Sequence, residues 1–312
     1  MALYTILGAN GTIANALIPV LQREKVDIRL VSRNPKPVDG IETMKADMLK
    51  TDQVLHAISG SNVVILTVGL QYNSKVWASE WPVIMCNVID ACKATGAKLI
   101  FFDNAYMYGK TDGVITETSL YNAVSKKGRI RASIARMLEK KMQEGSLKAI
   151  IARAVDFYGP NVTDKSAPGV YVLSNLKKGK RAQWPINADV PRSFNYVPDA
   201  AEALWLLANK ESAFGQIWHL PSALPALTGR EFIKVVSQNM GGNGKVTVLP
   251  KWIFKIMGLF VPFIREAYEL NYQDEYPFIF SSEKFEKAFD FTPTSYDKGI
   301  KQTSEWFMSS SK

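Results

Sequence analysis

The residues with the clearest chemical potential form a turn near the start of the chain, where residues 8–14 read Gly-Ala-Asn-Gly-Thr-Ile-Ala. This turn follows a short apolar run and opens an amphipathic one, as expected between a strand and a helix. Glycine at position 8 allows a tight turn, and Gly11 lets the backbone approach a pyrophosphate at the helix N-terminus. The pattern predicts a dinucleotide site, although its spacing is Gly-x-x-Gly-x-x-Ala rather than the more usual Gly-x-Gly-x-x-Gly.

The residues after the second predicted strand indicate which dinucleotide is bound. An NAD site usually has Asp or Glu there to accept a hydrogen bond from the ribose 2′-hydroxyl, whereas this chain has Ser32 and Arg33. A guanidinium in place of a carboxylate favours a 2′-phosphate and predicts NADP, with NAD less favoured. The alternative is that Arg33 is an ordinary solvated arginine. Asp47 could accept from the adenine amino group, or it could start the next turn.

Alternating elements must position these residues. Short runs, several of them nearly continuous in apolar residues and so expected to be buried on both faces, predict strands at Tyr4–Leu7, Ile28–Val31, Glu42–Lys45, Val63–Thr67, Leu99–Phe102 and Ala149–Arg153. Longer amphipathic runs predict helices at Thr12–Glu24, Thr51–Ile58, Glu80–Thr95 and Ser125–Gln143. This alternation predicts an α/β protein with a Rossmann-type, doubly wound parallel sheet. The first residues are expected to form a strand rather than a signal peptide.

The alternation of strand and helix patterns ends after Gly159-Pro160, and helix and loop patterns come to dominate. We expect residues 1–160 plus about 191–220 to form the Rossmann domain, and about 161–190 plus 221–312 a smaller, mostly helical substrate lobe. Phe194–Val197 and a helix at Asp199–Asn209 are expected to return to the first domain. The apolar run Trp252–Ile264 is too short to cross a bilayer of about 30 Å, and it predicts a buried helix or a lid in preference to membrane contact.

Segments along almost the whole chain resemble the extended short-chain dehydrogenase/reductase superfamily, which includes NAD-dependent epimerases and dehydratases. Besides the glycine turn, the similar segments are Asn87, Tyr108-Gly109, Arg153–Pro160, Arg192–Asp199, Ser281–Phe289 and Thr292-Pro-Thr. The resemblance implies a Rossmann domain that holds the cofactor and a C-terminal lobe that holds the substrate, with the reactive carbon between them.

The same resemblance implies a set of cofactor contacts at the ends of strands and on the following helices. These are Gly8, Asn10, Gly11, Thr12, Ile13, Ser32, Arg33, Asp47, Met48, Thr67, Val68, Gly69, Asn87, Lys127, Ala154 and Val155.

The catalytic signature of the superfamily is altered in this chain. In the family, a Ser or Thr precedes the Tyr-Gly pair after the fifth strand, and a Tyr-x-x-x-Lys motif follows further along. Here Asn104 stands at the Ser/Thr position, and alignment on Glu117-Thr-Ser puts Lys127 and Arg131 at the Tyr and Lys positions. The resemblance therefore implies a Lys127-x-x-x-Arg131 signature.

This substitution leaves several roles open for Lys127. The ordinary pKa of lysine is about 10.4, so a base near neutral pH needs it lowered by roughly 3, which costs about 4 kcal/mol. Burial and the charge of Arg131 would act in that direction. Lys127 could instead stay charged and polarise a carbonyl or hold a phosphate, the role that we favour, or it could be structural.

Other side chains could carry the proton. Tyr106, Tyr108 and Tyr121 belong to loops expected at the carboxyl edge of the sheet, where open α/β sheets bind their ligands. Asn104 could supply the hydrogen bond that Ser gives in the family. His56 and His219 are expected to be structural, and no residue pattern predicts a metal site.

Composition excludes several classes of protein. With 312 residues, of which 47% are hydrophobic and 21% charged, the chain is neither disordered nor fibrous. Cys86 and Cys92 are the only cysteines, and their spacing on one helix prevents a bridge between them. Reduced thiols favour a cytoplasmic protein.

The formal charge of +9 is concentrated in two segments. Residues 121–148 carry a net +6 and residues 165–188 a net +5, so the remainder is slightly acidic. A cleft bordered by both segments favours an anionic cofactor and small-molecule substrate over nucleic acid or a membrane. A homodimer that pairs the helices at 80–95 and 125–143 is a further expectation from the resemblance.

Together, the residues and the resemblance predict an NADP-dependent oxidoreductase, or an epimerase/dehydratase-like enzyme, with an altered catalytic centre. Its substrate is expected to be anionic or similar to a sugar nucleotide. The alternative is a regulatory protein that binds NADP(H) in the same cleft and has lost catalysis together with the Tyr and Lys.

Overall fold

The computed structural model describes residues 1–163 and 166–310, and contacts divide the chain into two compact, discontinuous units. Unit 1 consists of Met1–Met107, Lys126–Ala154 and Ala200–Trp218. Unit 2 consists of Tyr108–Ser125, Val155–Asp199 and His219–Lys312. The predicted first domain also included residues 108–125, 155–160 and 191–199, which lie in unit 2. The assignment of cofactor and substrate to separate domains stays a prediction.

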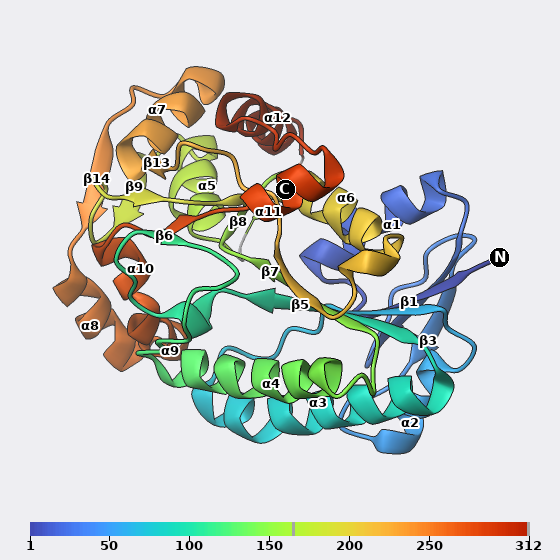
Figure 1. Ribbon diagram of the computed structural model, residues 1–312. Helices are drawn as coiled ribbons and strands as arrows, with labels where there is room; N and C mark the ends of the chain where they lie inside the picture. Colours follow the sequence, from blue (N-terminus) through green and yellow to red (C-terminus); the bar gives the residue numbers. More distant parts are fainter. Residues whose placement is uncertain (164–165, 311–312) are drawn as a thin grey trace. The chain divides into compact units, whose positions relative to one another are not determined.

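Unit 1 is built on a sheet of short strands with buried side chains (Figure 1). Its strands are β1 (Leu3–Leu7), β2 (Asp27–Ser32), β3 (Glu42–Lys45), β4 (Val63–Leu66), β5 (Lys98–Asn104), β7 (Ala149–Ala154) and β12 (Gln216–His219). They stand in the order β12-β7-β5-β4-β1-β2-β3, and each pairing from β3 through to β7 is parallel. This order confirms the predicted Rossmann-type sheet, with the switch in winding direction between β1 and β4.

Helices cover both faces of this sheet. Helices α2 (Thr51–Ile58), α3 (Ser74–Thr95) and α4 (Lys126–Gln143) lie on one face, and α1 (Thr12–Arg23) and α6 (Val197–Ala208) on the other (Figure 1). Helix α3 begins six residues before the predicted Glu80. The helix begins earlier because Asn73 caps it. The Asn73 side chain accepts hydrogen bonds from the N–H groups of Lys75 and Val76, at 2.9 and 3.3 Å.

Unit 2 combines helices with pairs of short strands. The paired strands are β10 (Pro191–Arg192) with β13 (Leu227–Thr228), β11 (Asn195–Tyr196) with β8 (Phe157–Tyr158), β14 (Val246–Leu249) with β9 (Ala182–Pro185), and β15 (Ile279–Phe280) with β6 (Val114–Ile115). The helices are a π-helix at Pro168–Leu173, α5 (Ser174–Lys177), α7 (Gly229–Met240), α8 (Lys251–Phe260), α9 (Pro262–Ala267), α10 (Tyr272–Glu275), α11 (Glu283–Phe289) and α12 (Tyr296–Ser309). Strand β11 pairs with β8, and both lie in unit 2, although the predicted first domain included both of them; the return of Phe194–Val197 to that domain stays a prediction.

The prediction that the helical run at Trp252–Ile264 is buried is wrong, and its alternative role as a lid stays a prediction. This run forms α8 and the start of α9, and its large side chains are open to solvent, with Trp252 61%, Leu259 74% and Phe260 80% exposed. Only Phe254 and Gly258 of α8 are buried, because one narrow side of the helix packs against the unit. No helix of the described residues is long and apolar enough to span a membrane.

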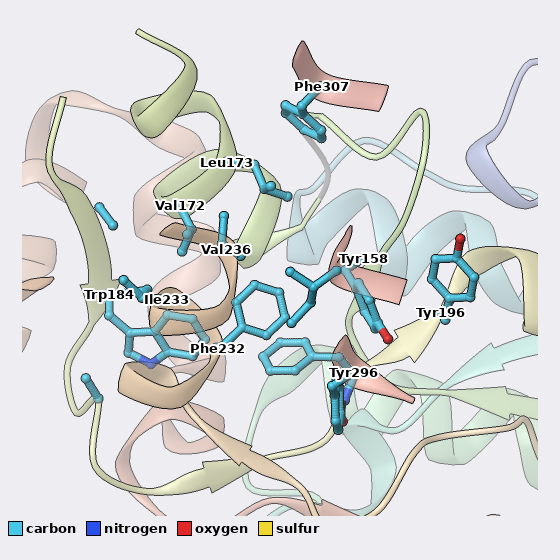
Figure 2. Packing of buried hydrophobic residues seen from close by; sticks show 14 residues of the cluster. Tyr158, Val172, Leu173, Trp184, Tyr196, Phe232, Ile233, Val236, Tyr296 and Phe307 are labelled. Carbon is cyan, nitrogen blue, oxygen red and sulfur yellow. Dashed lines mark hydrogen bonds between the residues drawn. The ribbon is translucent and has the colours of Figure 1, made fainter. Parts of the chain in front are cut away.

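An aromatic cluster forms the core of unit 2 (Figure 2). The rings of Trp184 and Phe232 both lie beside Phe194, with centroids 6.0 and 5.4 Å from it, and Tyr158 stacks on Tyr296 at 5.8 Å. Gly229, the first residue of α7, lets that helix start directly against Trp184, since an added Cβ would overlap the indole ring. The cluster thus depends on a residue without a side chain.

We expect Gly229→Ala to lower the free energy of unfolding by about 1–3 kcal/mol, because the new methyl group overpacks the Trp184 ring. The measurement is urea unfolding followed by tryptophan fluorescence. Gly69→Ala is the matched control, since a Cβ at Gly69 meets open space. Equal stability of the two variants would contradict the close packing of α7 on Trp184.

Candidate functional site

The glycine turn lies at the carboxyl edge of the sheet, between the ends of β2 and β4. The N–H groups of Gly8 and Ala9 both donate to the carbonyl oxygen of Val31, at 2.9 and 3.0 Å. Gly8 has a φ of 114°, and an added Cβ would lie 2.7 Å from the carbonyl carbon of Thr67 and from the nitrogen of Val68. Position 8 therefore requires glycine, both for its backbone angle and for the close approach of β4.

Helix α1 begins directly after this turn. Its N-cap is Gly11, which provides no side chain to cap the helix, and the first intrahelical bond runs from Asn15 to the Gly11 carbonyl at 2.9 Å. The N–H groups of Thr12 and Ile13 precede that bond, at the positively polarised end of the helix. Asn10 has a φ of 71°, and its side chain donates to the Asn34 carbonyl at 2.9 Å, which ties the turn to the loop after β2. This geometry suits a phosphate group.

A pocket opens beside the ends of β2 and β3. It is lined by Arg33, Asn34, Lys45, Ala46, Asp47 and Gln53. The strand register pairs Ser32 with Lys45, so the two cations of the pocket come from neighbouring strands. Lys45 was not among the predicted residues, because the sequence alone did not fix this register.

Several predicted cofactor residues are hydrogen-bonded within unit 1. An Asp47 oxygen accepts from the N–H of Leu49 at 3.1 Å, so this residue does start the turn that was its alternative role, and it also lines the pocket. The Asn87 amide donates to the Met48 carbonyl at 2.9 Å and accepts from the Thr51 hydroxyl at 3.0 Å. The Ser32 hydroxyl is buried and has no hydrogen-bond partner among the described residues.

The last predicted cofactor residues follow β4 and β7. The Thr67 hydroxyl donates to the Leu7 carbonyl at 3.1 Å, and Gly69 is exposed. Ala154 ends β7 and is buried, and the N–H of Val155 donates to the Asn195 side chain within unit 2 at 2.6 Å. Their contacts with a cofactor remain predictions.

A buried ion cluster anchors α4 to the sheet of unit 1. One oxygen of Asp103, in β5, accepts from the Arg131 Nε at 2.8 Å and from a second Arg131 nitrogen, and the other oxygen lies 3.4 Å from the Arg153 Nε. The Arg131 guanidinium also packs over the rings of Trp81 and Phe101, with its central carbon 4.4 and 4.9 Å from their centroids. These contacts account for the burial of Arg131 and fix the position of α4.

Lys127, one turn before Arg131, contacts the ring of Tyr72, which is in turn hydrogen-bonded to Tyr106. Its side chain is fully buried, and its Nζ lies 4.8 Å above the centre of the Tyr72 ring. The Tyr72 hydroxyl donates to that of Tyr106 at 3.4 Å, and the Tyr106 ring stacks on Trp77. The structure therefore brings the predicted residues Lys127 and Tyr106 together through Tyr72. Sequence analysis missed Tyr72, and the only available signal was its position in the loop after β4.

Asn104 and Tyr108, the remaining catalytic candidates, hold local structure. The Asn104 side chain accepts from the N–H of Tyr106 at 3.0 Å, which shapes the turn after β5. Tyr108 belongs to unit 2, is fully buried, and its hydroxyl lies 2.7 Å from the Nε2 of His219. The His219 Nδ1 is 2.8 Å from the Ser281 carbonyl, so His219 is structural, as expected. His56 instead lies exposed on α2. Both cysteines are free, as expected.

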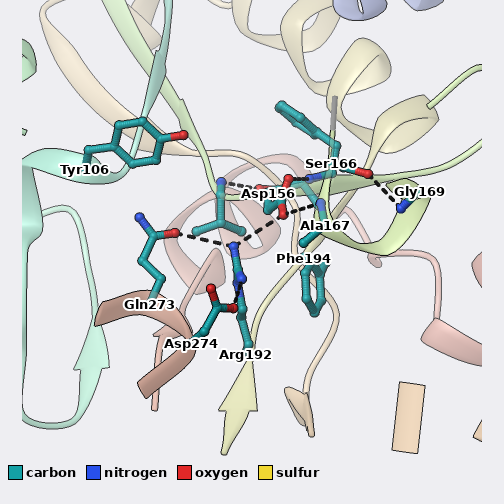
Figure 3. Close-up of polar contacts among 12 residues, drawn as sticks. Tyr106, Asp156, Ser166, Ala167, Gly169, Arg192, Phe194, Gln273 and Asp274 are labelled. Atoms are coloured by element: carbon teal, nitrogen blue, oxygen red, sulfur yellow. Dashed lines mark hydrogen bonds and ion pairs between the residues drawn. The ribbon is translucent and has the colours of Figure 1, made fainter. Parts of the chain in front are cut away.

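Unit 2 contains its own buried charge cluster around Arg192 (Figure 3). One Arg192 nitrogen donates to Asp274, and another lies 3.3 Å from Asp156 and 3.4 Å from the Gln273 oxygen. Burial raises the pKa of Asp274 to about 6, against the opposing effect of Arg192, and also raises the pKa of Asp156. The Arg192 charge is thus compensated within unit 2. Asp274 and Gln273 carried no recognisable sequence signal, because they come from a short helix far along the chain.

The fold and the glycine turn agree with a family assignment. A model of the NAD dependent epimerase/dehydratase family matches residues 4–220, and the chain belongs to this family of enzymes. No curated protein sequence matches the chain.

Solved structures of similar fold include sugar-nucleotide enzymes. A UDP-glucose 4-epimerase of Thermus thermophilus, solved with NAD, is 17% identical with a TM-score of 0.79, over 98% of this chain and 99% of that one. A UDP-glucose 4-epimerase of Thermotoga maritima, solved with UDP-glucose, is 16% identical with a TM-score of 0.80, over 98% of each chain. A dTDP-glucose 4,6-dehydratase of Bacillus anthracis, solved with NAD, is 14% identical with a TM-score of 0.80, over 98% of this chain and 96% of that one. These likenesses show the fold.

We expect Asp103→Asn to lower the free energy of unfolding by about 3–5 kcal/mol, because it leaves the buried Arg131 without its carboxylate partner and Arg153 with only Glu139, at 3.7 Å. Chemical denaturation measures the change. Asp189→Asn, which removes the carboxylate of the exposed ion pair with Arg230, is the control and should leave the unfolding midpoint unchanged. Similar midpoints for the two variants would show that the buried cluster does not hold α4.

Proposed function

We propose that this protein is an NADP-dependent oxidoreductase, or an epimerase/dehydratase-like enzyme, that acts on an anionic or sugar-nucleotide-like small molecule. The observation that carries the proposal is the cradle at the carboxyl edge of unit 1. There, a turn that only glycine can form leads into an uncapped helix N-terminus, beside a pocket with two cations.

The residues present fit a nicotinamide dinucleotide. The N-terminus of α1 would hold the pyrophosphate, and the pocket of Arg33 and Lys45 would hold the ribose end with its 2′-phosphate. The orphaned Ser32 hydroxyl supports the fit, since a buried polar atom without a partner suggests a missing ligand or water. In this pocket, Arg33 directly follows β2 and Lys45 is the last residue of β3. NADP is proposed over NAD because both of these side chains are cations.

We expect Arg33→Ala and Lys45→Ala each to weaken NADPH binding about tenfold or more, by removing a charge-assisted bond to the 2′-phosphate. NADH binding, which involves no such phosphate, should change little. The measurement is titration of the fluorescence of each reduced cofactor. Lys50→Ala is the control, because Lys50 is exposed near the pocket but does not line it. Wild-type protein that bound NADH as tightly as NADPH would refute the NADP assignment.

Lys127, Tyr72 and Tyr106 are proposed to handle the proton. A bound nicotinamide would supply the transfer of hydride. The Lys127 ammonium above the Tyr72 ring favours negative charge on that phenol, and the hydroxyl contact lets a proton pass between Tyr72 and Tyr106. In this arrangement Lys127 acts through a phenol from another loop rather than as the base itself. This arrangement would replace the altered Lys127-x-x-x-Arg131 signature by a Tyr–Lys pair drawn from two elements.

The proposed substrate class follows from charge and from the related folds. Helix α4 exposes Lys126, Arg129, Arg136 and Lys140, and the Thermotoga maritima enzyme of the same fold was solved with UDP-glucose. A sugar nucleotide or another anionic carbonyl or hydroxyl compound is compatible with such a surface.

We expect Tyr72→Phe and Lys127→Met to lower kcat by about 10²–10⁴-fold, the usual range for loss of an acid–base group, while NADPH affinity is kept. Turnover is measured as NADPH oxidation with a panel of carbonyl compounds, and as formation of the epimer or dehydration product with a panel of sugar nucleotides, because those reactions return the hydride and leave the cofactor unchanged overall. Tyr121→Phe is the matched control, because the Tyr121 ring packs against Tyr108 in unit 2. Full activity of Lys127→Met would move the acid–base chemistry elsewhere. Tight NADPH binding by the wild type with no turnover on the whole panel would support the regulatory alternative instead.

A further inference from the structure

Unit 2 exposes an apolar surface at the hairpin of α8 and α9, which we call the apolar hairpin. Its exposed side chains include Trp252 (61%), Ile256 (50%), Leu259 (74%), Phe260 (80%) and Phe263 (59%). Isolated exposed apolar residues are common, but a contiguous group of this kind on a soluble surface usually marks an interaction site. Neither the glycine cradle nor the proposed proton chemistry uses these residues.

The hairpin is built so that this group stays outside. At about 100° per residue, Trp252, Ile256, Leu259 and Phe260 fall on one stripe of α8, opposite the buried Phe254. Gly258 lets the two helices cross closely, since an added Cβ would lie 3.1 Å from the Arg265 Cα. The N–H of Val261 bonds to the Met257 carbonyl at 2.8 Å, so the turn is held. The exposed tip is therefore part of an ordered element.

Along the sequence of the apolar hairpin, residues 251–267, the three cations Lys251, Lys255 and Arg265 stand against one acid, Glu266. Residues 241–265 contain Lys245, Lys251, Lys255 and Arg265 and no Asp or Glu. Lys251 pairs with Glu275, whereas Lys255 and Arg265 are exposed and have no ion pair among the described residues. The first acids after this run, Glu266 and Glu269, are partly buried.

A second basic segment lies next to the first. The parallel register of β14 with β9 sets Val246 beside Ala182, which brings the exposed Lys180 and Arg181 close to Lys245. The exposed cations of this part of unit 2 thus also include Lys180, Arg181 and Lys245, which directly precede β9 and β14.

We propose that the apolar hairpin docks unit 2 onto an anionic lipid surface. Trp, Phe and Leu on one side of a helix, with Lys and Arg at its border, is the composition of helices that lie in the membrane interface. The apolar tip at Leu259, Phe260 and Phe263 enters the boundary between headgroups and acyl chains, and Lys255 and Arg265 meet the lipid phosphates. Contact of this kind needs no spanning helix.

A second copy of the chain is a poorer occupant for this surface. In a two-fold contact each residue meets its own neighbourhood, so Lys255 and Arg265 of one copy would face the same cations of the other. Like charges brought together at an apolar contact are unfavourable, whereas a lipid headgroup layer supplies the opposite charge. The charge of the hairpin therefore selects the lipid surface.

Vesicle flotation with the full-length protein tests the proposal. We expect binding to vesicles of phosphatidylcholine with about one third phosphatidylglycerol, and little binding to phosphatidylcholine alone. Phe260→Ser with Phe263→Ser should weaken the binding about tenfold or more, and Lys255→Glu several-fold, with a loss at high salt. Leu120→Ser is the matched control, because Leu120 is 85% exposed in unit 2 outside the hairpin, and it should bind as the wild type does.

Three results would overturn the proposal. The first is an absence of binding to both kinds of vesicle, and the second is equal binding by the wild type and the Phe260→Ser/Phe263→Ser double variant. The third is a dimer in sedimentation that the double variant converts to a monomer, which would assign the surface to a second copy. Because all these residues are exposed, unchanged thermal unfolding of each variant confirms that its fold is kept.

Discussion

The Asp103 carboxylate is the constraint on which the arrangement of unit 1 depends. It sits at the end of β5 and binds a guanidinium from α4 and another from β7, in a place that excludes water. A carboxylate held between two arginines satisfies charges that would otherwise be costly to bury. The helix that carries Lys127 is thereby fixed against the sheet, which sets the distance from this ammonium to the Tyr72 ring. Arg131 is thus part of a rigid support that contributes to the position of Lys127, one turn earlier on α4.

The elements that follow a strong local pattern could be predicted from the sequence. Most of the parallel strands are short apolar runs that are buried on both faces, and position 8 of the glycine turn has a backbone angle and a close contact that require glycine. Arg33 could be predicted to lie beside a ligand site because it directly follows the second strand of a predicted Rossmann-type order. The start of α3 was misplaced because its cap, Asn73, lies before a stretch interrupted by Pro82.

The remaining features depend on contacts between distant segments. The role proposed for Tyr72 depends on its contact with Lys127, and the role proposed for Lys45 depends on its register with Ser32. The cluster of Arg192, Asp156 and Asp274 joins three separate segments, none of which has a periodic pattern. At α8 a strong local pattern gave a wrong prediction. The hydrophobicity of this run predicted burial, but only one narrow side of the helix packs against unit 2. The composition of a segment indicates which environment its side chains favour, but the topology of the fold determines which neighbours surround them.

The division of the chain into two interleaved units has a consequence for how such a protein can change over time. The polypeptide passes from one unit to the other five times, so neither unit is a continuous stretch of sequence. A unit of this kind cannot be exchanged by a single recombination event, nor released intact by one proteolytic cut. An insertion or deletion within residues 108–125 instead changes unit 2 at a segment that leaves unit 1 and returns to it, without altering the sequence of the sheet on either side.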